Sequence, residues 1–382
     1  MRPRGTKRLD LMLTAEPNEI HRFPEIPRIF RLSSYHYDLP PELIAQEPAP
    51  KRDTSRLLVM ERATGRISHR SFAELPSLLS PSDLLVLNET RVVPARLTGH
   101  KLTGGRVELL VLDPAGEAIK TDNGECATRV CIFRSSKRVA PGTGIVLKEK
   151  VILTAREKVA PGRILVTFPV EEKGFSEFLE LHGTPPLPPY IRSRNRNEAQ
   201  DRERYQTVYS RISGSIAAPT AGLHFTPELL GELGNKGVTT ARILLHVGPG
   251  TFTPVRAEDV RRHKMESEFY EIRPEVAAAL NEARLERRRI IAVGTTTVRT
   301  LESSLTADGT FKSGRGRTDL FITPDYRFRA IQGLVTNFHL PGTTLLMLVC
   351  AFGGSELVMG AYLEAVGAGY SFYSFGDSCL IL

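Results

Sequence analysis

The chain has 382 residues, of which 41% are hydrophobic and 25% charged, and its formal net charge is +8 at pH 7. This composition predicts a globular protein of about two domains and excludes a fibrous or low-complexity chain. The longest strongly apolar run, Leu345–Phe352, is too short to span a bilayer, and no signal peptide is apparent. The four cysteines lack CxxC spacing, so we expect no disulfide framework, no metal site and a reducing cytoplasm. The positive charge suits a polyanionic partner and equally a mildly basic enzyme.

The N-terminal segment differs from the rest of the chain in composition. In residues 1–32 basic residues outnumber acidic ones, proline recurs and no hydrophobic period is sustained. We therefore predict a disordered basic extension, which is either a solvated tail or an arm that contacts phosphates. Another interpretation is a start codon assigned too early. Order is expected from about Tyr35.

Short apolar segments separated by glycine- and proline-containing turns predict a small β-barrel domain at residues 66–170. Within that range Asp83–Asn88 has the composition of a buried strand. After Val170 strands and helices alternate, which predicts an α/β catalytic domain made of residues 33–65 and 171–382. The predicted fold class is therefore α/β, with a layered α/β main domain and an inserted small β-barrel domain.

Two histidines lie in turns rich in glycine and proline that follow predicted strands. His224 belongs to AAPTAGLHF (Ala217–Phe225), and His246 belongs to LHVGPGTFTPV (Leu245–Val255). A histidine in such a turn can act as a general acid or base, because it titrates near neutral pH, or it can only hydrogen-bond the turn. Enzymes usually keep their sites in strand-end loops, so two such turns favour a shared cleft.

The segment HKMESE carries one histidine and two carboxylates. In a helix His263 and Glu266 would share a face, whereas in a strand Glu266 and Glu268 would do so. The segment is not an HExxH metalloprotease motif and no third ligand is evident, so a charge-rich solvated segment is the alternative. Asp377, in FGDS before the last predicted strand, is either a turn former or a carboxylate aimed into a cleft.

The segment GTTT (Gly294–Thr297) joins a predicted buried strand to a helix that carries Arg299. Backbone N–H groups at a helix start bind anions, and the hydroxyls of Thr295 and Thr296 add donors. Arg299 can clamp a carboxylate or a phosphate through two bonds. The alternative is a capped helix in which Arg299 pairs with Glu302.

Two further segments can recognise nucleic acid. In TNFHLP, Asn337 and His339 follow a predicted strand, and an asparagine can bind a base edge or a ribose hydroxyl. The basic loop Arg192–Arg204, with tyrosines nearby, suits single-stranded RNA, although its composition equally fits a solvated loop. The candidate RNA-binding residues are Arg192, Arg194, Arg196, Arg204 and Tyr205.

Between Tyr37 and Leu382 several long sequence blocks are distinctive. Among them are DLLVLNETRVVPARL, GTPPLPPYI, GSIAAPTAGLHFT, LHVGPGTFTPV, HKMESE, AVGTTTVRTLE, LVTNFHLPGTTLLMLVCAFGG and YSFYSFGDSCLIL. In this order they resemble the S-adenosylmethionine:tRNA ribosyltransferase-isomerase family of queuosine biosynthesis. Residues 1–32 have no counterpart in the family, and residues 115–150 match it weakly. Glu266 stands where many members have histidine.

The resemblance implies that S-adenosylmethionine donates its ribosyl carbons to the aminomethyl group of a 7-deazaguanine at the wobble position of a tRNA. Adenine and methionine leave, and the product is epoxyqueuosine. S-Adenosylmethionine is therefore a consumed donor rather than a true cofactor. No metal and no membrane are implied, and we expect a monomer.

This implied chemistry needs a base for a C5′ hydrogen beside the sulfonium and an acid for the departing adenine. The candidate proton-transfer groups are His224, His246, His263, Glu268 and Asp377. Of these, Glu268 or His246 is the candidate base. The candidate donor-binding residues, for the methionine carboxylate or the ribose, are Thr295, Thr296 and Arg299. Asn337 and His339 are the candidates for binding adenine or the modified base.

Two other functions compete with this interpretation. A tRNA methyltransferase could use the same donor, but its usual glycine-rich motif after a first strand, followed by an acidic residue on the next, is not apparent. A non-catalytic RNA-binding protein has no need of histidines and carboxylates in separate strand-end loops. Release of adenine, rather than of S-adenosylhomocysteine, distinguishes ribosyl transfer from both.

Overall fold

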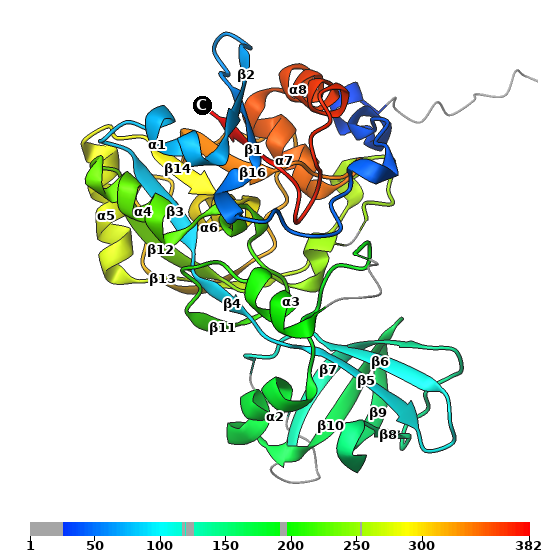
Figure 1. Cartoon of the computed structure of the whole chain (residues 1–382). Helices are drawn as coiled ribbons and strands as arrows, with labels where there is room; N and C mark the ends of the chain where they lie inside the picture. Colours follow the sequence, from blue (N-terminus) through cyan, green and yellow to red (C-terminus); the bar gives the residue numbers. More distant parts are fainter. Residues whose placement is uncertain (1–25, 117–118, 120–125, 192–196, 253) are drawn as a thin grey trace, which may run out of the picture.

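The computed structural model describes residues 26–116, 119, 126–191, 197–252 and 254–382. They form a nine-stranded sheet layered with helices and, beside it, a closed six-stranded barrel (Figure 1). The predicted fold class, α/β with an inserted small β-barrel, is confirmed.

The large sheet is mixed, and its strand order is β15-β13-β12-β3-β14-β16-β17-β1-β2. The strands are β1 (Arg56–Met60), β2 (Ile67–Ser71), β3 (Leu84–Asn88), β12 (Thr239–Leu245), β13 (Glu268–Ile272), β14 (Ile290–Val293), β15 (Gly314–Thr318), β16 (Gly333–Asn337) and β17 (Ser378–Ile381). The central strands β12, β3, β14 and β16 are parallel, so their carboxyl ends meet at one edge. Because β17 runs antiparallel to β16, the loop before β17 reaches the same edge.

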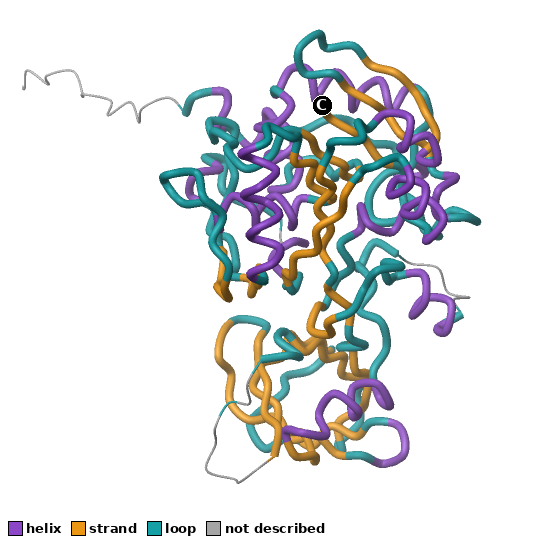
Figure 2. Tube along the Cα trace, turned by 90° about the vertical axis from the view of Figure 1, so that its left-hand side faces the viewer, coloured by secondary structure: helices purple, strands orange, loops and turns teal. Residues whose placement is uncertain are grey.

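Helices cover both faces of this sheet, as the view in Figure 2 shows. In β3, Leu84 and Val86 belong to one hydrophobic cluster, and Leu85 and Leu87 to another. The first cluster includes residues of α5 (Pro274–Leu285), α6 (Thr295–Ser304), α7 (Thr344–Gly353) and α8 (Ser355–Gly367). The second includes residues of α1 (Leu75–Leu78) and α4 (Pro227–Asn235). A continuous apolar run is what a parallel strand buried on both faces requires.

No single helix of the described residues combines the length and hydropathy needed to cross a membrane. Helices α7 and α8 reach that threshold only together, as a pair bent by 116°. Both contribute to the core under the large sheet.

The barrel has its own hydrophobic core. Its strands are β5 (Arg96–Lys101), β6 (Arg106–Val111), β7 (Cys126–Ser135), β8 (Gly144–Val146), β9 (Ile152–Ala160) and β10 (Arg163–Glu171), closed in the order β10-β7-β6-β5-β8-β9. A Cβ at Gly99 would lie 2.5 Å from the carbonyl oxygen of Val146, so glycine permits the close approach of β5 and β8. Helix α2 (Phe175–His182) packs on this core through Phe175 and Phe178.

The barrel begins at Arg96, not at residue 66. Strands β2 and β3 lie in the large sheet, because the apolar run of β3 is buried on both faces there. A short buried strand has the same sequence pattern in either setting, which explains the misplaced boundary. Two connections join the bodies: β4 (Thr90–Val92) on entry and β11 (Ile212–Ser215) on exit, paired in parallel. Helix α3 (Glu198–Arg204) precedes the second connection.

The predicted disordered extension lies outside the described residues up to residue 25. For residues 26–32, the described part of this extension, the prediction of disorder is wrong, because they are folded onto the main domain. Phe30 and Leu32 pack against the main core, and the Leu32 N–H donates to the carbonyl oxygen of Glu258 at 2.8 Å.

Candidate active site

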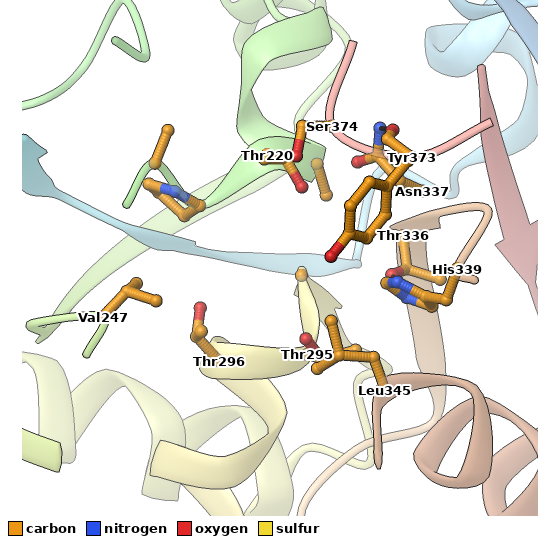
Figure 3. Close-up of a pocket in the computed structure, with 14 residues that line it drawn as sticks. Thr220, Val247, Thr295, Thr296, Thr336, Asn337, His339, Leu345, Tyr373 and Ser374 are labelled. Carbon is orange, nitrogen blue, oxygen red and sulfur yellow. Dashed lines mark hydrogen bonds between the residues drawn. The ribbon is translucent and has the colours of Figure 1, made fainter. Parts of the chain in front are cut away.

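A small pocket lies at the carboxyl edge of the parallel strands, and we call it the strand-end pocket (Figure 3). Its lining residues are Ala218, Pro219, Thr220, Ala221, Val247, Gly294, Thr295, Thr296, Thr336, Asn337, His339, Leu345, Tyr373 and Ser374. Four of the predicted binding residues therefore meet here: Thr295, Thr296, Asn337 and His339. Open α/β sheets bind ligands at this edge.

The turn from β14 into α6 depends on Gly294, whose φ of 87° lies in the left-handed region that favours glycine. Helix α6 begins directly after it, and no side chain caps its first turn. Thr295 and Thr296 of that turn line the strand-end pocket. Hydroxyls and the N–H groups of a helix start are donors suited to a carboxylate or to ribose oxygens.

Asn337, at the end of β16, is held in one orientation. Its Nδ2 donates to the carbonyl oxygen of Tyr373 at 3.0 Å and to Nε2 of His224 at 3.3 Å. Its Oδ1 is buried and has no hydrogen-bond partner among the described residues. Leaving a buried acceptor unpaired costs about 1–3 kcal/mol, so a ligand amino or hydroxyl group would find a prepared partner here.

His224 supports the pocket from behind and does not line it. Its ring is buried, and burial, the largest cause, lowers its pKa to about 4, which keeps the imidazole neutral at pH 7. Because Nε2 accepts from Asn337, Nδ1 carries the proton and donates to Oγ of Ser55 at 2.7 Å. The hydroxyl of Ser55 in turn donates a hydrogen bond to the carbonyl oxygen of Arg52 at 3.3 Å.

His339 lines the strand-end pocket and is also neutral at pH 7. Burial lowers its pKa to about 3. Its Nε2 shares a hydrogen bond with Oγ1 of Thr336 at 2.9 Å, and its backbone N–H donates to the hydroxyl of Tyr362 at 3.2 Å. The contact with Thr336 therefore holds the imidazole in place, where it forms a neutral and polar part of the pocket wall.

A second cavity of about 300 Å³ lies where the two domains meet, and we call it the junction pocket. It is lined by Leu112, Asp113, Arg163, Gly214, His246, Val247, Gly248, Pro249, Glu266, Ser267, Glu268, Phe269 and Arg317. It unites the two candidate bases, His246 and Glu268. Val247 lines both pockets, so the two cavities are neighbours.

His246 follows β12 and is fixed by two contacts. Its Nδ1 shares a hydrogen bond with Oγ1 of Thr90 at 2.9 Å, and its ring stacks on Phe269 with 5.6 Å between centroids. Burial lowers its pKa, against the opposing charges of Asp113 and Glu271. The imidazole is thus neutral at pH 7 and available as a proton acceptor.

Glu268, at the start of β13, has both carboxylate oxygens engaged. Oε1 accepts the N–H of Gly248 at 2.8 Å, and Oε2 forms a buried ion pair with Arg299. Arg299 also donates to the carbonyl oxygens of Leu320, at 2.9 Å, and Thr318, at 3.2 Å. The carboxylate therefore anchors the turn that carries His246.

Arg299 does not line the strand-end pocket, so the expected clamp on the donor is not formed. The alternative pairing with Glu302 is also wrong. Glu302 accepts the N–H of Ala330 at 2.9 Å and the hydroxyl of Tyr326 at 3.1 Å. Helical spacing suggested the local partner, whereas β13 brings a carboxylate from 31 residues away.

Besides His224, two other predicted proton-transfer residues line neither pocket. His263 is half-buried with its ring edge-on to Phe321, and burial lowers its pKa. Asp377 accepts the N–H groups of Arg56, at 2.7 Å, and Ser371, at 2.8 Å, while burial raises its pKa. Of the two interpretations of Asp377, these contacts favour the turn former over the carboxylate aimed into a cleft.

The predicted RNA-binding loop is described only in part. Arg192, Arg194 and Arg196 lie outside the described residues. The Arg204 guanidinium donates to the carbonyl oxygens of Ala49, at 2.6 Å, and Pro50, at 3.3 Å. Tyr205 is buried beside Phe375, so a role as a stacking platform for bases is wrong.

Sequence reasoning missed Asn88, which connects the two pockets. Its Nδ2 donates to the carbonyl oxygen of Leu245, at 3.0 Å, and to Oγ1 of Thr296, at 3.3 Å. Its Oδ1 accepts the N–H groups of Thr90 and Leu245. The available signal was its position as the last residue of a buried strand. Among the described residues no group of three or more His, Cys, Asp or Glu side chains could hold a metal ion.

The fold and the two pockets define a two-domain α/β protein with two neighbouring pockets at the carboxyl edge of its sheet. A family model described as "Queuosine biosynthesis protein" matches residues 32–381. The chain belongs to this family.

Relatives and a solved structure agree with that assignment. An S-adenosylmethionine:tRNA ribosyltransferase-isomerase of Symbiobacterium thermophilum is 51% identical over 92% of this chain and 100% of its own length. A protein of the same name from Moorella thermoacetica is 48% identical over 92% and 100%. The crystal structure of an S-adenosylmethionine tRNA ribosyltransferase from Thermotoga maritima is 37% identical, with a TM-score of 0.51, and covers 91% of this chain and 100% of that one.

Proposed function

We propose that this chain transfers and isomerises the ribosyl group of S-adenosylmethionine onto 7-aminomethyl-7-deazaguanine at the wobble position of a tRNA. The product is epoxyqueuosine-tRNA, and adenine and methionine are released. The observation that carries this proposal is identity of 47–51% over at least 92% of the chain with relatives named for that activity. We further propose a cytoplasmic monomer that consumes S-adenosylmethionine without a metal or a true cofactor.

The strand-end pocket is the proposed donor site. Thr295 and Thr296 would bind the methionine carboxylate or the ribose, and Oδ1 of Asn337 would accept from the adenine amino group or a ribose hydroxyl. The unpaired Oδ1 supports this assignment. Neutral His339 would border the ligand without adding a charge beside the positive sulfonium.

The donor site must widen to admit its ligand. The pocket measures about 30 Å³, whereas pockets for ligands of this size hold roughly 300–1,000 Å³. Tyr373 forms part of the wall and adopts a φ of 76°, a strained conformation for a residue other than glycine. We propose that the loop before β17, which carries Tyr373, moves when the donor binds.

His246 is the proposed base for the C5′ proton. Its neutral imidazole lines the junction pocket, next to the donor pocket across Val247. Glu268 is the weaker candidate, because both its oxygens already have partners. We therefore give Glu268 and Arg299 the role of holding the turn at Gly248, and His224 the role of holding Asn337.

Product analysis tests the proposal. Wild-type protein with S-adenosylmethionine and tRNA carrying the 7-aminomethyl-7-deazaguanine should release adenine and methionine in equal amounts. Release of S-adenosylhomocysteine instead would establish methyl transfer, and the absence of any small-molecule product would leave RNA binding alone. Asn337→Ala should raise the KM for S-adenosylmethionine about tenfold, because it removes the acceptor. An unchanged KM would remove Asn337 from the donor site.

A further inference from the structure

A third cavity, of about 480 Å³, opens between the barrel and the main domain, and we call it the interdomain cleft. One wall consists of residues of β5, β6, β7 and β10 of the barrel. The other consists of the proline-rich loop 186–189 and of Pro249, Pro254 and Arg256. None of the predicted catalytic or donor-binding residues lines this cleft.

The chemistry of the cleft walls suits single-stranded RNA. Apolar surface is provided by Leu110, Ile132 and the prolines, while Arg134 and Arg256 are exposed at its rim. Four arginines line the cleft against two glutamates, so its net charge attracts phosphate. Splayed nucleotides of RNA loops stack on aromatic rings or on the planes of arginine guanidinium groups, and the cleft offers the guanidinium groups. The volume falls in the range of pockets that take a ligand of nucleotide size.

The interdomain cleft adjoins the junction pocket. Arg163, Pro249 and Glu266 line both the interdomain cleft and the junction pocket. At this boundary Arg163 of β10 forms an ion pair with Glu266, which precedes β13, so the pair links the two domains. Both side chains are about one-third exposed, and solvent screening makes such a pair easy to exchange.

We propose that the interdomain cleft admits a nucleotide of a single-stranded RNA loop, and that Arg163 exchanges Glu266 for an RNA phosphate as the nucleotide enters. This inference rests on the proposed function, in which the loop is the anticodon loop of the tRNA. The entering base then faces the junction pocket and His246, while the donor reaches the same pocket from the strand-end side.

Binding of an anticodon stem-loop RNA, measured without S-adenosylmethionine over a range of salt concentrations, tests this inference. Glu266→Gln frees Arg163, so the stem-loop should bind several-fold more tightly. Because Arg163 contacts the phosphate in both the variant and the wild type, the slope of log K against log salt should change by less than the roughly 0.7 of one additional single-strand phosphate contact. The paired change Arg134→Gln and Arg256→Gln should weaken binding about tenfold and make the slope shallower. Both of these arginines are exposed, so the fold should tolerate their replacement.

Arg70→Gln is the matched control, because Arg70 is exposed on β2 at the far edge of the large sheet. Its binding should equal that of the wild type. If the Arg134/Arg256 variant binds as Arg70→Gln does, or if Glu266→Gln leaves the affinity unchanged, the inference is overturned. Adenine release by the wild type is the separate readout of the proposed function. If the wild type releases adenine but the cleft variants bind RNA as the wild type does, only the role of the cleft is refuted. If the cleft variants change RNA binding but the wild type releases no adenine, only the proposed ribosyl transfer is refuted.

Discussion

Nδ2 of Asn337 donates a hydrogen bond to Nε2 of His224 over 3.3 Å, and this bond couples the strand-end pocket to a buried ring behind its wall. The same amide group also donates to the carbonyl oxygen of Tyr373. With both amide hydrogens committed, Oδ1 is the polar atom of this side chain that lacks a partner among the described residues. We therefore expect the histidine to set the orientation of an acceptor rather than to move a proton.

His224→Phe should weaken the binding of S-adenosylmethionine about five- to tenfold, because it removes a hydrogen bond of about 1–1.5 kcal/mol that orients Asn337. The phenyl ring keeps the contact with Phe72, whose ring centroid lies 5.0 Å from that of His224. Titration of the donor in His224→Phe, Asn337→Ala and the double variant measures the effect. The double variant should lose no more affinity than Asn337→Ala alone. Fully additive losses, or a shifted pH–rate profile in His224→Phe, would contradict the positioning role.

Glu268→Gln should lower the free energy of unfolding by about 3–5 kcal/mol, because it leaves the buried guanidinium of Arg299 without its counter-charge. Urea unfolding followed by circular dichroism measures this loss. The matched control is the double variant Glu268→Met with Arg299→Met. It should lose less than the single variant, because no uncompensated charge stays buried. A single variant as stable as the wild type would show that the ion pair contributes nothing.

The pH dependence of kcat/KM should report His246. A base acts in its neutral form, and burial lowers the pKa of His246 below its ordinary value of 6.5. The rate should therefore be level through neutral pH and decline only as the pH falls below 6.5. His246→Asn should reduce kcat by about 10²–10⁴ and abolish this acid limb. Wild-type turnover in His246→Asn would exclude it from the mechanism.

Two buried histidines should make the fold sensitive to acid. The pKa values of His224, about 4, and His339, about 3, lie below the 6.5 of the unfolded chain. Unfolded protein therefore binds more protons between these values, and stability falls as the pH drops below 6.5. Each histidine contributes a slope of up to about 1.4 kcal/mol per pH unit. His339→Gln should flatten the profile in urea unfolding between pH 4 and 6.5, and an unchanged slope would argue against burial as the cause.

The layered sheet was predictable from the sequence because its central strands are continuous apolar runs. The same property hid the domain boundary, since Asp83–Asn88 shows no alternation that would assign it to a sheet or to a barrel. The grouping of Thr295, Thr296, Asn337 and His339 followed from their common position after parallel strands. Their roles in binding stay predictions.

The hydrogen-bond and ion-pair partners of the site residues could not be predicted from sequence patterns, because each partner comes from a distant segment. Ser55 meets His224 across 169 residues, and Asn88 meets Thr296 across 208. Arg299 had a plausible carboxylate one helical turn away, and only the path of β13 supplies the actual partner. Tyr205 seemed suited to stacking by residue type, whereas its burial is a property of tertiary packing alone.

The pairing of β1 with β17 has a consequence for the order of folding. The backbone N–H of Arg56 donates a hydrogen bond to Asp377, 321 residues away in the sequence, whereas the barrel strands follow one another along the chain. Contacts of low sequence separation form sooner, because less loop entropy is lost in making them. During synthesis the barrel can therefore fold while the large sheet still lacks the strand that joins β16 to β1. The strand-end pocket, which needs the loop before β17, is among the last features of the molecule to form.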